Sequence, residues 1–261
     1  MLGMPEPTAY DLKFRVLGIP VRVHPLFWLV TVLLSRTENL KVILIWTACV
    51  FASILVHELG HGLMARSFGS SPAIVLHSMG GLCFSEPERL TPWQRLVVIL
   101  GGPGAQLVLL GVILLAGGLF FRITPGEDLF LIGNLLGLSL GGVPSLALAM
   151  LPETTARVFI YLVEINLLWA LLNLFPVWPL DGGQAAGILL SMHDRRRGMH
   201  RAHVISLLTA GLLAMWMLQK QEYFMALFFG YFALINYQVL HVMHQSAKYD
   251  LSEDDAGWWK R

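Results

Sequence analysis

The chain has 261 residues, of which 56% are hydrophobic and only 13% are charged. An ordinary soluble domain has about 25% charged residues, so this composition, with a mean hydropathy of +0.64, excludes a soluble globular protein. The formal net charge of +1 excludes a global basic field, and we therefore expect no nucleic-acid partner. The two cysteines, Cys49 and Cys83, lack the repeated spacing of a zinc ribbon or a disulfide scaffold.

The apolar segments predict a membrane protein that crosses the bilayer several times. A transmembrane helix needs about 20 apolar residues to cross about 30 Å of hydrocarbon. We expect six spans, at residues 21–35, 42–65, 93–121, 156–177, 203–218 and 223–244. A glycine-rich apolar run at 129–151 is expected to be re-entrant or interfacial on the outer side. The predicted fold is an all-α polytopic membrane protein with about six transmembrane helices and a short β-like or re-entrant loop after the second.

The basic residues predict the orientation. With the N-terminus inside, thirteen of the 18 Lys and Arg residues lie on the inner side, in agreement with the positive-inside rule. We expect no cleaved signal peptide, a cytoplasmic segment at 1–20, a membrane domain at 21–244 and a short tail at 245–261. Both termini are then cytoplasmic, with the bacterial cytoplasmic membrane as the expected location. The segment 194–203, which contains four arginines, is interpreted as a solvated loop that meets anionic lipid headgroups.

The second predicted span carries His57-Glu58-Leu59-Gly60-His61, which matches H-E-x-x-H. Residues i and i+4 of a helix share a face, so both imidazoles can reach one Zn²⁺, with Glu58 beside it as a general base. The alternative is a chance match on a charged surface helix. Ionisable groups at hydrocarbon depth are costly unless they are partnered, which favours the functional interpretation.

A catalytic zinc ion typically has three protein ligands and one coordination position open for water or substrate. Asp181 is the leading candidate for the third ligand, because Pro179 and the glycines that follow Asp181 stop the preceding helix and let the carboxylate turn inward. The alternative is an ordinary turn aspartate, since Asp-Gly is also a strong turn signal.

Together, the helical HELGH and the later NLFPVWPLDGG at 173–183 resemble the site-2 protease family of intramembrane zinc metalloproteases. Three further segments match this family: VRVHPLFWL at 21–29, the loop MGGLCF at 79–84, and the GGP that begins GGPGAQ at 101–106. The form WPLDGG is most similar to the branch of the family that processes a sporulation sigma-factor precursor. The resemblance implies that His57, His61 and Asp181 bind one zinc ion and that Glu58 is the general base. It implies cleavage of a peptide bond in or near a substrate's transmembrane segment.

The chain departs from the family in two places. The family usually has G-P-x-x-N in the third span, where this chain has Gln106. The chain also has no room for a PDZ or CBS module, so we expect regulation to be absent or supplied by another chain, as a regulatory membrane partner or a homodimer.

Asn173 follows Asn166 by seven residues, which puts both on one helical face. By resemblance, Asn173 is a candidate donor to the developing oxyanion; the alternative is an interhelical hydrogen bond, for instance to Gln106. Glu164 is not expected to face the metal. His77 is a candidate for substrate contact or gating.

A substrate helix must unwind before its carbonyls can be attacked. The segment 73–85 is a candidate edge strand that pairs with the unwound substrate, or alternatively a packed re-entrant loop. Two rival functions are a non-proteolytic membrane scaffold and a metal- or proton-linked transporter. The intact cluster disfavours the first, and the lack of inverted repeats disfavours the second. The expected function is therefore a zinc endopeptidase with a membrane-protein substrate in the lipid bilayer.

Overall fold

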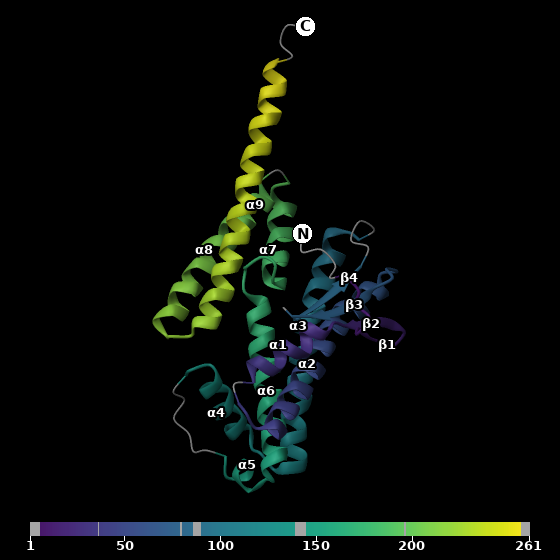
Figure 1. Cartoon of the computed structure of the whole chain (residues 1–261), viewed down its shortest axis with the longest axis vertical. Coiled ribbons are helices and arrows are strands. Elements are labelled where there is room, and N and C mark those ends of the chain that lie inside the picture. The colour runs from purple at the N-terminus through teal and green to yellow at the C-terminus, as the bar shows by residue number, and fades with distance from the viewer. Residues whose placement is uncertain are drawn as a thin grey trace. The chain divides into compact units, whose positions relative to one another are not determined.

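The computed structural model describes residues 6–35, 37–78, 80–85, 90–138, 145–195 and 197–256, with side chains as far as Gln245 (Figure 1). Five of the described helices are long and apolar enough to cross a membrane, by length and composition: α2 (Leu40–Ser67), α3 (Pro92–Phe121), α6 (Glu153–Leu174), α8 (Gly198–Gln219) and the Tyr223–Gln245 part of α9 (Tyr223–Ala256). The chain divides into two compact units, Met1–Leu172 and Asn173–Arg261.

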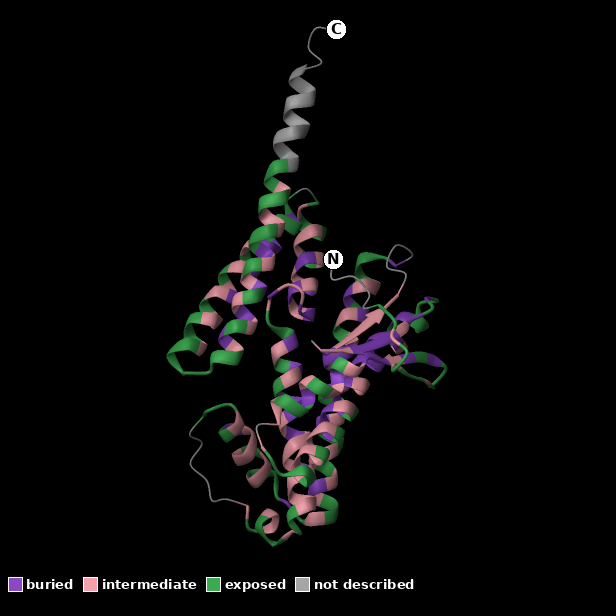
Figure 2. Cartoon of the chain, in the orientation of Figure 1, coloured by how far each residue is buried: buried purple, intermediate pink, exposed green. Residues whose placement is uncertain are grey.

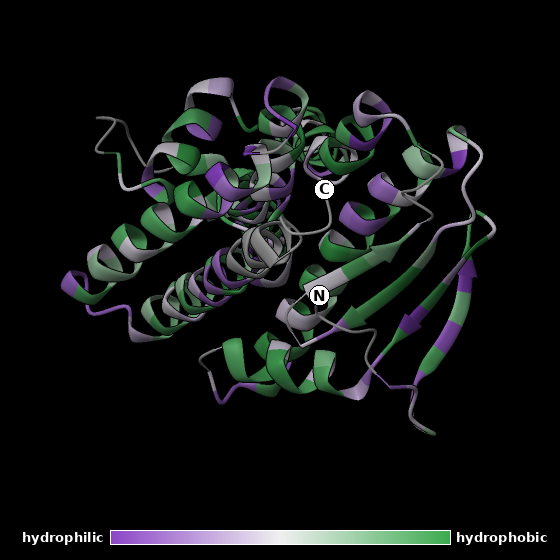
Figure 3. Ribbon diagram, turned by 90° about the horizontal axis from the view of Figure 1, so that it is seen from above, coloured by the Kyte–Doolittle hydropathy of each residue, from purple (hydrophilic) through white to green (hydrophobic). Residues whose placement is uncertain are grey.

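The first unit contains a four-stranded sheet in the order β1-β2-β3-β4. Strands β1 and β2 form an antiparallel hairpin, β3 runs parallel to β2, and β4 returns antiparallel to β3. The outermost strand alternates between hydrophilic and hydrophobic residues (Figure 3), which is the pattern of a sheet with one buried face. The strands are β1 (Leu12–Val16), β2 (Ile19–Val23), β3 (Ala73–His77) and β4 (Gly80–Phe84).

The buried face of the sheet packs against the C-terminal half of α2. Ile19 lies next to Gly62, and the strand residues Val21 and Leu76 belong to the same apolar cluster as Ile54 on the helix. Buried residues concentrate where the sheet meets the helices (Figure 2). The sheet therefore lies beside the part of α2 that carries the HELGH motif. The expected β-like loop after this helix is the β3–β4 hairpin; Met79 lies outside the described residues.

The structure differs from the prediction at residues 21–35. Residues 21–23 belong to β2, and only α1 (Pro25–Leu34) is helical. The helix begins at Pro25, where His24 Nδ1 accepts a hydrogen bond from the Leu26 amide. Its ten residues extend about 15 Å, half the hydrocarbon thickness, so α1 alone is too short to span. The sequence interpretation missed the switch from strand to helix because Val21 and Val23 continue directly into the apolar residues of α1.

The helix predicted at 93–121 is confirmed as α3, a candidate membrane span that continues through Pro103. The run 129–151 contains two short helices, α4 (Pro125–Leu135) and α5 (Leu146–Met150), and neither is long enough to cross a bilayer. They pack against an apolar cluster that includes Ile123 and Phe159. Residues 139–144, including Pro144, lie outside the described residues.

The second unit contains α7 (Asp181–His193) and the antiparallel hairpin of α8 and α9, which was predicted at 203–244. One interpretation was wrong here. His203 does not lie in a solvated loop: α8 begins at Gly198, and the side chain of His203 is only 4% exposed. Helix α9 continues into the predicted tail as far as Ala256, and residues 257–261 lie outside the described residues.

Candidate metal centre

The HELGH motif lies within α2 and forms a buried cluster. His57, Glu58 and His61 are at most 9% exposed, and their potential ligand atoms all lie within 4.8 Å of one another. The Nε2 atoms of the two histidines are 3.1 Å apart. Among the described residues this is the only group of three or more His, Cys, Asp or Glu side chains so arranged. The predicted pairing of residues i and i+4 on one helical face is confirmed.

Hydrogen bonds at the other ring nitrogens hold both histidines in one tautomer. His57 Nδ1 lies 3.0 Å from Gln106 Oε1, and His61 Nδ1 lies 2.8 Å from the carbonyl oxygen of Val98. Both partners are acceptors, so each Nδ1 carries its proton and donates it. Each Nε2 then presents a lone pair to the other.

Two lone pairs that face each other at 3.1 Å repel unless a cation lies between them. A separation of 3.1 Å would allow both Nε2 atoms to bind one Zn²⁺ ion. The donor set is therefore suited to a zinc ion, and Glu58 lies within reach of it.

Helix α3 closes one side of the cluster. It supplies Gln106, which is completely buried, and it passes the histidines at Gly102. A Cβ atom at residue 102 would overlap the ring of His61 and lie 2.8 Å from His57 Nε2. The glycine at this position thus leaves the space in front of both Nε2 atoms open, which a metal site requires.

Strand β4 closes the other side of the cluster. A Cβ atom at Gly81 would overlap the carboxylate of Glu58, so the backbone of this edge strand runs directly beside the expected general base. Cys83 is on the same strand. Burial, and next the nearby carboxylate of Glu58, raise the pKa of its thiol, so Cys83 stays protonated.

Asp181 belongs to the second unit, where it is the first residue of α7 and is 7% exposed. The loop before it is tied to α8 and α9. The Trp178 amide donates to Ser206 Oγ at 2.9 Å, and the Trp178 carbonyl accepts from Asn236 Nδ2 at 2.8 Å. Asn236 Oδ1 lies 2.7 Å from His203 Nδ1. This buried polar network holds the segment that carries Asp181.

Asn173 also belongs to the second unit and is 8% exposed. The structure thus brings together His57, Glu58 and His61, and it shows Asp181 and Asn173 as buried polar residues of the other unit. Asn166, which was predicted to share a helical face with Asn173, donates from Nδ2 to Ser53 Oγ at 2.9 Å and bridges α6 to α2 one turn before His57.

His77 lies at the end of β3, away from the HELGH cluster along the chain. Its ring is 4.6 Å from that of His24, and its Nδ1 is 2.8 Å from Ser78 Oγ. Burial lowers the pKa of His77, and the nearby His24 and Arg22 lower it further. This histidine is therefore neutral near pH 7.

Sequence reasoning missed the partners that orient the site. The Val98 carbonyl leaves no signal in a sequence, because every residue has one. Gln106 and Asn236 do leave a signal, since a polar side chain within an apolar span is costly unless it has a function. From the sequence, Gln106 is a departure from the family pattern and an alternative partner of Asn173, not a partner of His57, and Asn236 is not considered.

Residues 45–218 match peptidase family M50. A zinc metalloprotease candidate of Synechocystis sp. is 33% identical over 181 residues, which is 64% of this chain and 40% of the relative. The zinc metalloprotease of Methanocaldococcus jannaschii is 26% identical and covers 70% of this chain and 46% of its own length. Stage IV sporulation protein FB of Bacillus subtilis is 25% identical over 79% of this chain and 60% of its own length. The chain thus spans less than half the length of the first two relatives.

A solved structure has the same fold. The site-2 protease from Methanocaldococcus jannaschii aligns with a TM-score of 0.57 and 21% identity, over 88% of this chain and 95% of that chain. A helical membrane fold with a small sheet is therefore shown, as is the resemblance that the motifs indicated.

Proposed function

The chain belongs to peptidase family M50, and from this we propose that it is an intramembrane zinc endopeptidase that cleaves a peptide bond in or near the transmembrane segment of a membrane-bound substrate. The observation that carries the proposal is the pair of converging Nε2 atoms, with both Nδ1–H groups donated elsewhere, beside a buried glutamate. Regulation, where it exists, comes from a regulatory membrane partner or a second copy of the chain.

His57, His61 and Asp181 are the proposed zinc ligands. When bound, Zn²⁺ would act as a Lewis acid that polarises a carbonyl group and lowers the pKa of a bound water molecule to about 7. The hydrogen bonds that the two imidazoles donate to Gln106 and Val98 keep both rings in the ligating tautomer. The polar network around Trp178 supports the proposed role of Asp181, because it orients the segment from which the carboxylate projects.

Glu58 is the proposed general base. Its carboxylate accepts a proton from the attacking water and returns it to the leaving amine. Asn173 is the proposed donor of a hydrogen bond to the developing oxyanion, a role worth about 3 kcal/mol where it has been measured. Both groups are buried, and exclusion of water strengthens such interactions.

The substrate is proposed to bind as an extended strand along β4. This strand forms one edge of the sheet, and its backbone passes Glu58 at Gly81. An unwound substrate exposes backbone N–H and C=O groups that need hydrogen-bond partners at membrane depth. The edge of β4 can supply these partners from its own backbone, as in an added β-strand. The same pairing brings a substrate peptide bond beside the general base.

The proposed protease domain, 21–244, includes parts of both compact units. We propose that it lies in the bacterial cytoplasmic membrane with both termini in the cytoplasm, supported by the distribution of basic residues.

The test uses the purified full chain in detergent with membrane-spanning test peptides. Glu58→Gln should retain stoichiometric zinc and lose cleavage, whereas Asp181→Asn should lose zinc. The matched control is Glu164→Gln, because Glu164 is a half-buried glutamate of α6 outside the cluster, and it should cleave at the wild-type rate. Cleavage that survives Glu58→Gln would refute the protease assignment. A non-proteolytic scaffold would yield no cleavage product from the wild-type chain or from any variant. A transporter would carry metal ions or protons across the membrane without forming a cleavage product.

A further inference from the structure

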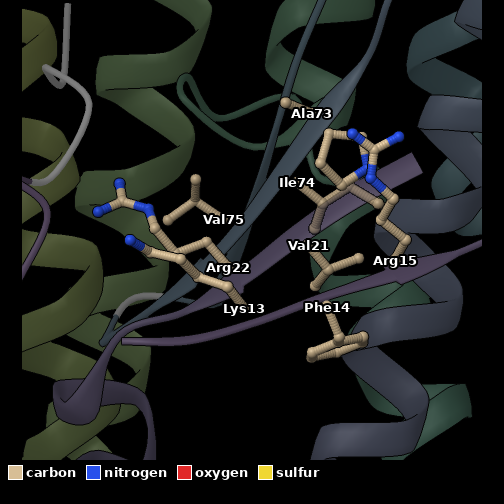
Figure 4. A pocket seen from close by; sticks show the side chains of 9 residues that line it. Lys13, Phe14, Arg15, Val21, Arg22, Ala73, Ile74 and Val75 are labelled. Atoms are coloured by element: carbon tan, nitrogen blue, oxygen red, sulfur yellow. The ribbon is translucent and has the colours of Figure 1, made fainter. Parts of the chain in front are cut away.

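The β1–β2 hairpin has two chemically different faces, because strand side chains alternate. Phe14 and Val21 point into the core beside α2. Lys13, Arg15 and Arg22 point to the opposite side of the strands, as Figure 4 shows. This second side, called here the cationic face, comprises the outward side chains of β1 and β2 and plays no part in the proposed chemistry.

A depression of about 490 Å³ lies over the hairpin and β3. The three cationic side chains line it together with apolar residues of the neighbouring strands, among them Pro20, Ala73 and Val75. It therefore combines positive charge with an apolar floor, as a site for an amphiphilic anion would.

Two of the three charges on this face, those of Lys13 and Arg15, are not balanced by a neighbouring carboxylate among the described residues. Lys13 is directly opposite Arg22 in the strand register, and like charges in this position are destabilising. Asp11 pairs with Arg22 at 2.9 Å. Within the part of the chain that the structure describes, no carboxylate forms an ion pair with Lys13 or Arg15. An anion bound between Lys13 and Arg15 would balance these two charges.

The hairpin is tied to the polar end of α2. The carbonyl oxygen of Leu17, in the β1–β2 turn, accepts a hydrogen bond from Arg66 Nη1, and Ile19 lies against Gly62 one turn earlier on the helix. Because α2 is a candidate membrane span that ends at Ser67, the turn lies where that span leaves the hydrocarbon. Phospholipid headgroups are found at this level.

From the unpaired cations, the amphiphilic depression and its level on α2, we propose that the cationic face binds an anionic phospholipid, with the headgroup phosphate between Lys13 and Arg15 and the glycerol and first methylenes over Pro20 and Val75. An acidic segment of the protein substrate would suit the cationic face less well than a phospholipid. The proposed substrate edge, β4, is three strand spacings away from β1, about 14 Å.

Binding is measured on the purified full chain in non-ionic detergent by native mass spectrometry, with dioleoylphosphatidylglycerol and dioleoylphosphatidylcholine as ligands. The test variant is Lys13→Gln/Arg15→Gln, and Lys13→Arg/Arg15→Lys keeps the charge. The matched control, Lys41→Gln/Lys220→Gln, removes two exposed cations from other parts of the chain.

Each cation near an anionic headgroup contributes about fivefold in affinity, so loss of both should weaken phosphatidylglycerol binding about 30-fold at low salt. The charge-conserving variant and the control should stay within about twofold of wild type, and phosphatidylcholine should bind weakly to all. Equal affinity for the two lipids, or an unchanged test variant, would overturn the proposal. Displacement of the lipid by equimolar inorganic phosphate would show an anion site without lipid recognition, and tighter binding of a polyglutamate peptide would show a peptide site; either result also overturns it.

Discussion

Replacement of Gln106 by leucine should lower the affinity of the protein for zinc. The hydrogen bond between His57 Nδ1 and Gln106 Oε1 is 3.0 Å long, and both side chains are almost completely buried, so water cannot take the place of the amide. Without it, the tautomer that binds metal leaves a buried N–H group unpaired, at a cost of about 1–3 kcal/mol. This corresponds to a loss of about 5- to 150-fold in zinc affinity. Partners of this kind typically contribute 10- to 100-fold.

The assay is competition for zinc between the purified protein and a chelator of known affinity, with thermal unfolding of the zinc-free protein as a measure of folding. Gln106→Glu keeps an acceptor at the same position and should retain tight binding. Asn166→Leu is the matched control, because Asn166 is an equally buried amide of the same unit that contacts Ser53 instead of a histidine. It should lower stability and leave zinc affinity unchanged. A Gln106→Leu protein that folds and binds zinc within twofold of wild type would refute the reasoning.

Two further predictions concern the other polar networks. Asn236→Leu should destabilise the protein by about 1–3 kcal/mol for each buried group that it leaves unpaired, as thermal unfolding in detergent should show, whereas Gln238→Leu on the exposed face of the same helix should have little effect. Hydrogen bonds from Thr8 and Arg22 lower the pKa of Asp11 to about 2. The stabilisation is therefore present above the ordinary pKa near 4 and is lost as the pH falls through about 2. The difference in melting temperature between wild type and Asp11→Asn should be constant from pH 7 to 5 and disappear near pH 2; a difference that persists there would contradict this assignment.

The sequence predicts the helical part of this fold well, and it predicts the metal cluster for a definite physical reason. The i, i+4 spacing of His57 and His61 determines their geometry once the segment is a helix, and the apolar run around them leaves no other choice. Gln106 and Val98 lie 49 and 37 residues away from their histidine partners, so their contacts depend on how α3 crosses α2. Such contacts cannot be read from local spacing. His203 was misjudged for a similar reason, because its partner Asn236 belongs to another helix.

The first predicted span shows most clearly where local reasoning fails. Helix α2 has 28 residues and is about 42 Å long. The preceding segment lies along it, first as the strand β2 and then as the helix α1. β2 lies beside the HELGH half, and α1 lies beside the other half, where Trp46 Nε1 donates to the Thr31 carbonyl. Five strand residues and ten helical residues together extend about the 30 Å that hydrocarbon requires. A helix throughout would satisfy its own backbone, whereas the strand must be paired, and β1 and β3 supply that pairing. The strand therefore extends the sheet along the HELGH half of α2, and the sheet in turn ends at the edge strand β4 beside Glu58. Conversion of this segment into a continuous helix would deprive β3 of its partner β2, and the β3–β4 hairpin that carries the proposed substrate edge would lose this support.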